Sequence, residues 1–212
     1  MTDSTDVAGI VFVIDDDPSV RRALERQLGT IGFQVEAFAS AQEYLEHPPP
    51  EGIACIVSDV RMPGMDGLDL QATLERMNRS LPIVFITGHG DIPTSVRAMK
   101  AGAVDFLAKP FSESELLKSV VEALIRSAES ARLRRDDTAL RVRYESLTPR
   151  ERDVFGLVTA GLLNKVIADR LGTAEKTIKI HRGRVMEKMG AKSLAELVRM
   201  AERLLQKPAT RV

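Results

Sequence analysis

The chain has 212 residues, an ordinary apolar share of 44% and equal numbers of basic and acidic side chains, 30 of each. This length suffices for one large or two modest domains. No apolar run approaches the roughly 20 residues that cross a bilayer, and Met1–Ser4 lacks the basic start of a signal peptide. The lone Cys55 stands in an apolar run, which favours a buried thiol over a redox role. We therefore expect a cytoplasmic protein without a membrane segment.

The balanced charge hides an asymmetry between the two ends of the chain. Residues 1–125 contain 10 Lys and Arg against 19 Asp and Glu, whereas residues 126–212 contain 20 against 11. An acidic front indicates a part that handles cations, and a basic back indicates a part that meets a polyanion. We predict a front domain over 1–125, a charged linker over 126–146 and a second domain over 147–212.

The front domain alternates short β-rich runs with helical stretches. The predicted strands cover residues 10–14, 33–38, 53–57, 83–86 and 104–107. Three of these five runs are nearly continuous in Val, Ile and Phe, as strands buried on both faces of a parallel sheet must be. Asp17 and Asp91 each precede a proline-containing first helical turn and are expected to cap those helices. The alternation predicts a doubly wound α/β fold with a five-stranded parallel sheet.

The back of the chain has a helical pattern throughout. Residues 126–145 are rich in Arg, Asp, Glu and Ala, and we expect them to extend the last front-domain helix. Four short helices are predicted to follow. Thr148–Glu151 is a capping box that opens the first, and Asn164 is the expected cap of the second. The third is expected over 174–189, and Ser193–Glu196 is a capping box that opens the fourth.

Polar residues gather where the predicted strands end. Asp15–Asp17 follows the first strand, Asp59 the third, Thr87 the fourth and Lys109 the fifth. Because ligands of open α/β sheets sit beyond the carboxyl ends of the strands, these groups should meet at one edge. Neighbouring carboxylates repel unless a cation joins them, and Mg²⁺ (or Mn²⁺) with oxygen ligands is the natural occupant. A carboxylate at this edge can also act as a nucleophile toward a phosphoryl group.

The front domain resembles the receiver domains of two-component response regulators, which have a flavodoxin-like fold. The resemblance is carried by five residues in order, each at a strand end: Asp15, Asp16, Asp59, Thr87 and Lys109. Asp59–Gly67 is similar to the segment after the phosphoacceptor in that family. Lys109–Phe111 is similar to its Lys-Pro segment, where the peptide bond is usually cis.

The resemblance implies three sets of functional residues. Asp59 would be the phosphoacceptor, with Thr87 and Lys109 contacting phosphoryl oxygens. The metal ligands would be Asp16 and Asp59 directly, Asp15 through water, and the backbone carbonyl of Arg61. The switch pair would be Thr87 and Phe106. The family would further imply a sensor histidine kinase as phosphoryl donor, dimerisation on phosphorylation, and no turnover of an external substrate.

Several residues near this edge have alternative interpretations. Asp17 is interpreted as a helix cap rather than a metal ligand. Arg61 and His89 either overhang the phosphoryl site and steer attacking water, or are solvated loop residues. Asp15–Asp17 also contains the Asp-x-Asp of haloacid-dehalogenase-type phosphohydrolases. Those enzymes place Thr or Val where Ser19 stands and need substrate-capping insertions, for which the front domain is too short.

The third helix of the back domain has two different faces. The inward face is predicted to carry Ile178, His181, Val185 and Met189, with His181 as a partly buried core residue. The opposite face is basic and narrow, which suits a DNA major groove, and an outward Ile180 can touch a thymine methyl group. The expected DNA contacts are Lys165, Lys176, Thr177, Lys179, Ile180 and Arg184, with Lys165 holding the backbone.

Three segments of the back domain resemble the LuxR-type helix-turn-helix: Leu147–Arg152, Gly161–Ala168 and Lys176–His181. The whole chain is therefore similar to response regulators of the NarL/FixJ type, with the FixJ-like branch favoured by Thr87–Asp91 and Lys192–Ala201. This resemblance implies double-stranded DNA as a partner, and RNA polymerase as a further one. The alternatives are a phosphorylation-independent DNA-binding regulator that uses the receiver for dimerisation, and an RNA-binding antiterminator. The intact receiver residues argue against the first, and the lack of aromatic stacking platforms in the back domain argues against the second.

Two positions depart from the family pattern. Ala174 stands where a hydroxyl cap is usual, so either Thr173 caps the third helix or that helix starts frayed. Gly183 stands in mid-helix, where glycine costs about 1 kcal/mol. Either the backbone approaches DNA closely at Gly183 or a base contact is lost there.

Overall fold

A computed structural model of the chain describes residues 9–88 and 92–205. Contacts divide the chain into two compact units, Met1–Ala131 and Arg132–Val212. Two residues singled out from the sequence, His89 and the expected cap Asp91, lie outside the described residues. Within the described part of the chain, no helix is both long and apolar enough to cross a membrane.

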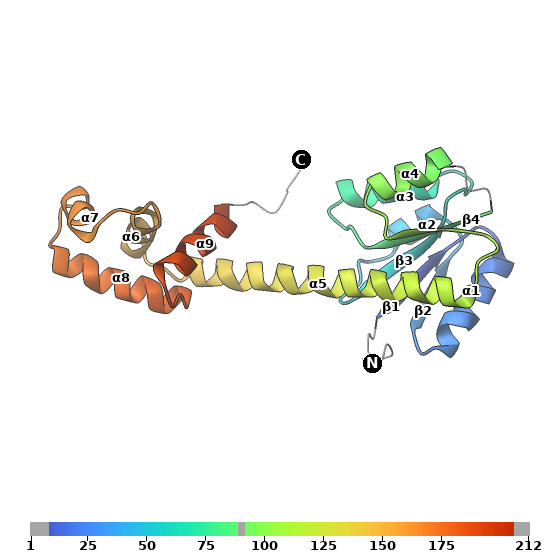
Figure 1. Ribbon diagram of the computed structural model, residues 1–212, viewed down its shortest axis with the longest axis horizontal. Coiled ribbons are helices and arrows are strands. Elements are labelled where there is room, and N and C mark those ends of the chain that lie inside the picture. Colours follow the sequence, from blue (N-terminus) through green and yellow to red (C-terminus); the bar gives the residue numbers. More distant parts are fainter. Residues whose placement is uncertain (1–8, 89–91, 206–212) are drawn as a thin grey trace. The chain divides into compact units, whose positions relative to one another are not determined.

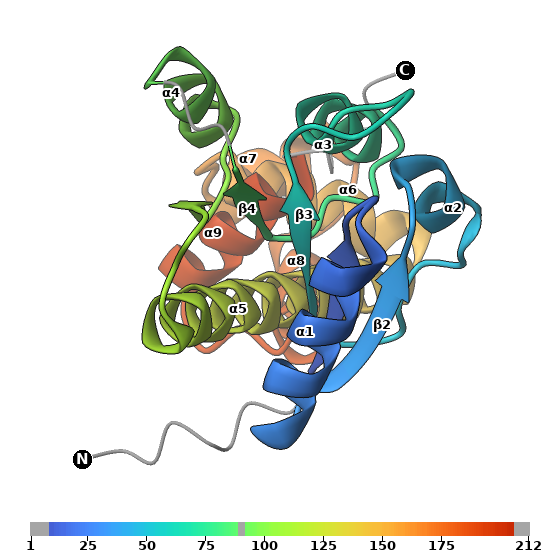
Figure 2. The same cartoon turned by 90° about the vertical axis from the view of Figure 1, so that its right-hand side faces the viewer.

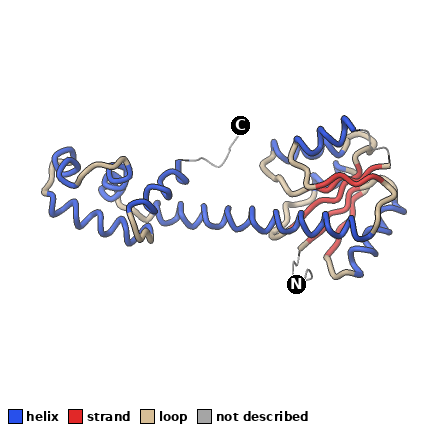
Figure 3. Tube along the Cα trace, in the orientation of Figure 1, coloured by secondary structure: helices blue, strands red, loops and turns tan. Residues whose placement is uncertain are grey.

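The front unit is built on a parallel sheet of five strands in the order β2-β1-β3-β4-β5. The strands are β1 (Ile10–Ile14), β2 (Gln34–Phe38), β3 (Ala54–Asp59), β4 (Ile83–Thr87) and β5 (Asp105–Ala108). They form the red bundle of Figure 3. β1, β3 and β4 are almost completely buried, which explains their continuous apolar sequences. The predicted doubly wound α/β fold is confirmed, and this strand order is the flavodoxin-like one.

Helices cover both faces of the sheet (Figures 1 and 2). One face packs against α1 (Pro18–Thr30) and the first part of α5 (Glu113–Glu145). The other face packs against α2 (Ala41–Glu46), α3 (Gly67–Arg76) and α4 (Ile92–Lys100). Because both faces are covered, the open end of the sheet, where the strands finish, is the place left for polar chemistry.

α5 is a single helix of 33 residues. Its first part is buried in the front core through residues such as Leu116 and Leu124, and Ser127 accepts a hydrogen bond from the backbone N–H of Ala54 at 3.1 Å. Its last part contributes Leu140 and Tyr144 to the core of the second unit. The charged residues between these parts are exposed, and they belong to the same helix, which continues to Glu145.

The second unit is all helical, as predicted. After the end of α5 come α6 (Pro149–Thr159), α7 (Asn164–Arg170), α8 (Glu175–Met189) and α9 (Leu194–Leu205). Their apolar faces enclose one core, in which Val154, Ile167, Ile178, Val185 and Leu197 are completely buried.

The helix starts of this unit differ in how they are capped. Thr148 and Glu151 form the predicted capping box of α6. The prediction for Asn164 is wrong, because Leu163 is the N-cap of α7, makes no side-chain cap bond, and Asn164 lies inside the helix. Ala174 is the N-cap of α8 and likewise makes no side-chain bond, so Thr173 does not take that role.

At α9 the predicted capping box is only half formed. The Ser193 hydroxyl accepts from the Glu196 N–H at 3.2 Å. The Glu196 carboxylate, however, accepts from the N–H of Lys192, at 2.8 Å, instead of that of Ser193. One reciprocal bond of the box is therefore shifted by one residue.

Candidate functional site

Strand register brings the polar strand ends of the front unit together. The pairings at the carboxyl edge are Ile14 with Ser58, Asp59 with Ile86, and Thr87 with Ala108. Asp15 and Lys109 each follow one of these paired residues directly. The sheet therefore places Asp15, Asp59, Thr87 and Lys109 along one edge, as the sequence predicted.

Lys109 links the two carboxylates at this edge. Its Nζ lies 2.8 Å from Asp15 Oδ2 and 2.9 Å from Asp59 Oδ1. The Asp15 and Asp59 side chains are only 2% and 9% exposed, whereas Lys109 is 26% exposed. The Lys109–Pro110 peptide bond is cis, as the family resemblance suggested, and the Lys109 N–H donates to the carbonyl of Thr87 at 2.7 Å. The ammonium group is thus delivered to the carboxylates by the segment that follows β5.

The charge of Lys109 is reinforced by its neighbours. Burial lowers the pKa of this ammonium, but hydrogen bonds and opposite charge from Asp15 and Asp59 outweigh that effect. The pKa of Lys109 consequently lies above its ordinary value, and the group remains a cation. One cation nevertheless faces two carboxylates, so the cluster retains an excess of negative groups.

The start of α1 positions the acidic run. The Asp17 N–H donates to Asp15 Oδ1 at 2.9 Å, and Asp17 itself accepts from the hydroxyl and N–H of Ser19. The hydrogen bond from the Ser19 hydroxyl, followed by that from its N–H, lowers the pKa of Asp17. These bonds confirm the interpretation of Asp17 as a helix cap. Arg21 donates to the carbonyls of Asp15 and Asp16 at 2.6 and 3.0 Å, a contact that no sequence motif indicated.

Asp59 is held from the backbone as well. Its Oδ2 accepts from the Arg61 N–H at 2.6 Å, so each carboxylate oxygen has a donor. A Cβ at Gly67 would lie 2.5 Å from the carbonyl oxygen of Asp59 and 2.9 Å from the Phe85 ring. Only glycine therefore fits where α3 begins against the end of β3. In the sequence, the Asp66-Gly67 pair that follows the predicted strand was the feature that could have indicated this close approach of α3 to the end of β3.

The donor set of the edge suits a partly hydrated hard cation. Among residues 9–88 and 92–205, no three His, Cys, Asp or Glu side chains are arranged to hold a metal by themselves. Mg²⁺, however, keeps several waters and takes only one or two carboxylates from a protein. Asp59 at this edge and the exposed Asp16, which follows Asp15 directly in the chain, can supply two such carboxylates, while Asp15 and Asp59 share a single ammonium. These residues fit Mg²⁺ in its usual coordination.

The expected switch residues lie next to the cluster. Thr87 is 2% exposed at the end of β4. Phe106 on β5 is half-buried, and its ring centroid lies 6.5 Å from that of Phe85. The Phe106 ring thus packs on the edge of the front core.

In the second unit, α8 has one buried apolar face and one exposed face. Ile178, Val185 and Met189 are completely buried, and His181 is half-buried with its Nδ1 lacking a hydrogen-bond partner among the described residues. The opposite face is exposed, and Ile180 keeps 50% of its surface accessible. The predicted DNA contacts that are exposed are Lys165 on α7 and Lys176, Lys179, Ile180 and Arg184 on α8, while Thr177 is half-buried.

Two polar contacts that hold α8 in place were not expected from the sequence. Arg182 donates to the amide oxygen of Asn164 at 3.1 Å, which gives Asn164 its role between α7 and α8. Lys188 donates to the buried Glu151 carboxylate at 2.7 Å and to the Ser146 carbonyl at 3.2 Å. The hydrogen bond from Lys188, helped by the Thr148 N–H, lowers the pKa of Glu151 to about 2. The exposed face of α8 is therefore presented by a fixed scaffold.

Comparison with known families assigns both units. The family model of the response regulator receiver domain matches residues 11–121, and that of the bacterial regulatory proteins of the luxR family matches residues 145–201. The chain belongs to the response regulators of the NarL/FixJ type. This response regulator joins a receiver domain to a LuxR-type DNA-binding domain, and it is a transcriptional regulator.

Known relatives align with the response regulator over most of its length. Nodulation protein W of Bradyrhizobium diazoefficiens is 52% identical over 195 residues, which cover 92% of this chain and 86% of that relative. The transcriptional regulatory protein FixJ of the same species is 46% identical over 198 residues, with coverage of 92% and 95%. Response regulator protein TodT of Pseudomonas putida is 43% identical over 200 residues, with coverage of 94% and 88%.

Solved structures give the same assignment. The response regulator StyR matches with a TM-score of 0.79 at 48% identity, over 92% of this chain and 99% of that one. Full-length FixJ from B. japonicum matches with a TM-score of 0.56 at 43% identity, over 92% and 97%. The fold and family of this response regulator therefore rest on sequence and structure together.

Proposed function

We propose that this response regulator is switched by transfer of a phosphoryl group to Asp59. The donor is a phosphohistidine of a sensor kinase: a new bond joins phosphorus to an Asp59 oxygen, while the P–N bond breaks and its electron pair returns to the histidine. The observation that carries this proposal is the Asp59 carboxylate held 2.9 Å from the Lys109 ammonium at the carboxyl edge of the sheet. The receiver assists this transfer to itself and turns over no external substrate.

The neighbouring residues have distinct tasks in this proposal. Lys109 already donates to both Asp15 and Asp59, so after phosphorylation its ammonium can pair with a phosphoryl oxygen in place of the Asp59 carboxylate. The Thr87 hydroxyl donates to another phosphoryl oxygen. Asp16, Asp59 and the Arg61 carbonyl would hold Mg²⁺ (or Mn²⁺) directly and Asp15 would hold it through water, and the bound ion would supply positive charge to offset that of the transferred group.

The output of the switch is DNA binding. In this proposal Thr87 moves toward the phosphoryl group, and Phe106 turns into the space behind it. The surface of α4, β5 and α5 then favours a homodimer, which presents two α8 helices to a two-fold operator and brings RNA polymerase to the promoter. The protein acts in the bacterial cytoplasm, where this DNA is found.

The DNA contacts divide into two kinds. Lys165 and Lys176 neutralise phosphates, so their loss should weaken binding to all sequences and reduce its salt dependence. Thr177, Lys179 and Arg184 approach phosphates and base edges, while Ile180 reads thymine methyl groups. An Ile180→Ala variant that bound operator and non-operator DNA as well as the wild type would remove Ile180 from this set.

The test uses beryllofluoride with Mg²⁺, which mimics a phosphoryl group on an aspartate. Sedimentation and binding to a mixed operator pool are measured for wild type and Asp59→Asn, with and without the mimic. We expect the mimic to dimerise only the wild type and to tighten its DNA binding. If both proteins bind DNA equally under all conditions, the receiver is not a switch, and a phosphorylation-independent regulator takes its place.

A further inference from the structure

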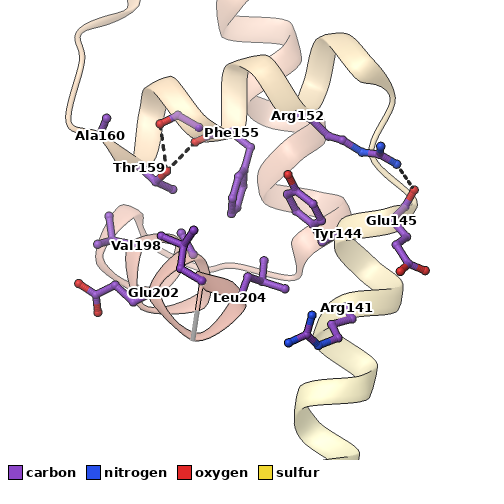
Figure 4. Close-up of a pocket in the computed structure, with 13 residues that line it drawn as sticks. Arg141, Tyr144, Glu145, Arg152, Phe155, Thr159, Ala160, Val198, Glu202 and Leu204 are labelled. Atoms are coloured by element: carbon purple, nitrogen blue, oxygen red, sulfur yellow. Dashed lines mark hydrogen bonds between the residues drawn. The ribbon is translucent and has the colours of Figure 1, made fainter. Parts of the chain in front are cut away.

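The second unit contains a cavity that its DNA-binding role does not use. Its volume is about 660 Å³, it is half open to solvent, and it is lined by the end of α5, by α6 and by α9 (Figure 4). The residues that matter here are Arg141, Tyr144, Phe155, Gly156, Val198 and Leu204. Cavities of about 300–1,000 Å³ hold most small-molecule ligands of proteins. α8, whose outer face would meet DNA, contributes no residue to the lining.

The interior of the cavity is aromatic and aliphatic. The Tyr144 and Phe155 rings meet edge to face with their centroids 5.3 Å apart, and Val198 and Leu204 lie across from them on α9 (Figure 4). Such walls favour the burial of an apolar body. Gly156 has no side chain at its place in the α6 wall, and no atom lies within 4 Å of where a Cβ would stand, so there is space for a larger residue there.

Two guanidinium groups, those of Arg141 and Arg152, stand beside the cavity. Arg152 is committed, since it donates to the Glu145 carbonyl at 2.8 Å and lies 5.7 Å from the centre of the Tyr144 ring. Arg141, by contrast, makes no hydrogen bond or ion pair with any described residue, and it projects from α5 on the side of α9 (Figure 4). The Glu145 and Glu202 carboxylates point away from the rings. A guanidinium beside an apolar cavity matches a carboxylate with an apolar body.

We infer that this cavity binds a small organic carboxylate whose apolar or aromatic body packs between Phe155 and α9 and whose carboxylate pairs with Arg141. Such a ligand would join α5, α6 and α9, so it would stabilise the DNA-binding unit by mass action. This is an input separate from Asp59. It does not depend on the proposed phosphoryl switch.

The test uses 2-naphthoate and its uncharged counterpart, 2-naphthalenemethanol. The chain has no Trp, so the fluorescence of either probe can be followed during titration with the full-length protein. We expect saturable binding, with the carboxylate bound about tenfold more tightly than the alcohol because only it pairs with the guanidinium. Absence of saturable naphthoate binding at millimolar protein would overturn the inference.

Two pairs of variants locate the probe. Arg141→Gln should remove the preference for the carboxylate and leave alcohol binding unchanged, while Arg132→Gln, an exposed position of α5 outside the cavity, should change neither. Gly156→Phe should fill the cavity and weaken both probes at least about tenfold, while Gly156→Ala should have little effect. Circular dichroism checks that each variant is folded. Unchanged naphthoate binding in Arg141→Gln or in Gly156→Phe contradicts the site.

The phosphoryl switch and this site can fail separately. Asp59→Asn should bind naphthoate as the wild type does, because the cavity contains no receiver residue. A loss of binding in Asp59→Asn would mean that the probe sits elsewhere and would overturn the assignment.

Discussion

Each unit of this response regulator pairs buried carboxylate with lysine, and the two clusters differ in the number of carboxylates that one lysine serves. In the receiver, Asp15 and Asp59 share the one ammonium of Lys109. In the DNA-binding unit, Glu151 is the single carboxylate that pairs with Lys188, and it also accepts a hydrogen bond from the Thr148 N–H. Lys188 donates a further hydrogen bond to a backbone carbonyl. The same residue types therefore form a cluster with two carboxylates for one lysine in the receiver, and an ion pair of one carboxylate with one lysine in the DNA-binding unit. If Asp59 is the phosphoacceptor, as we propose, the ratio of carboxylates to lysine rather than burial distinguishes the reactive cluster from the structural one.

The largest expected effect comes from removing each lysine. Lys109→Gln should destabilise the receiver by about 3 kcal/mol, because two buried carboxylates lose their only shared cation. Lys188→Gln should cost the second unit about 1–2 kcal/mol, because Glu151 keeps its backbone donor, the Thr148 N–H. Hydrogen exchange of β3 and α8 amides measures the two units separately. Added Mg²⁺ should restore stability only to Lys109→Gln, and equal restoration of both would erase the distinction.

When a carboxylate is removed instead of a lysine, the DNA-binding unit should lose more stability than the receiver. Glu151→Gln should destabilise its unit by about 1–3 kcal/mol, since Lys188 loses its charged acceptor. Asp59→Asn should leave receiver stability unchanged or slightly raised, because it relieves the excess of carboxylates. Chemical denaturation of both variants checks the signs. A clear loss of stability in Asp59→Asn would show that Asp59 is structural in the same way as Glu151.

Acid should weaken the second unit through Glu151. The pKa of this carboxyl is about 2 in the folded state against an ordinary 4.5, so its contribution is complete above pH 4.5. That contribution, about 1–3 kcal/mol, is lost as the pH falls from 4.5 through 2. Hydrogen exchange of α8 amides at pH 6, 4 and 3 follows the loss. Glu151→Gln is the control, because its stability should lack this part of the pH dependence.

The smallest effect concerns the glycine on the exposed face of α8. Gly183→Ala should stabilise the free protein by about 0.5–1 kcal/mol, because no atom lies within 4 Å of the added Cβ and alanine favours a helix. Gly156→Ala in α6 is the matched control for the gain in helix propensity. If the α8 backbone approaches DNA, only Gly183→Ala should also weaken operator binding. Equal DNA binding by both variants would leave Gly183 without a role at the interface.

Much of the fold follows from local sequence patterns. Runs such as Ile10–Ile14 and Ile83–Ile86 are short, apolar and rich in β-branched residues, which favours buried strands, and the polar residues after them indicated the candidate edge. Caps were less predictable. Thr148 forms the expected capping box because its partner Glu151 is only three residues away. Asn164 does not cap its helix, and its side chain instead accepts a hydrogen bond from Arg182 of another helix.

Sequence by itself determined the class of this protein, the edge that collects Asp15, Asp59, Thr87 and Lys109, and the outward face of α8. These features depend on strand period, helix period and chain order, which are local or set by parallel strand topology. Only the tertiary structure decided that one lysine serves two carboxylates, that Lys188 closes on Glu151, and that α5, α6 and α9 leave a cavity beside Arg141. Those features arise where side chains from distant segments meet, and their distances depend on packing that no local pattern records.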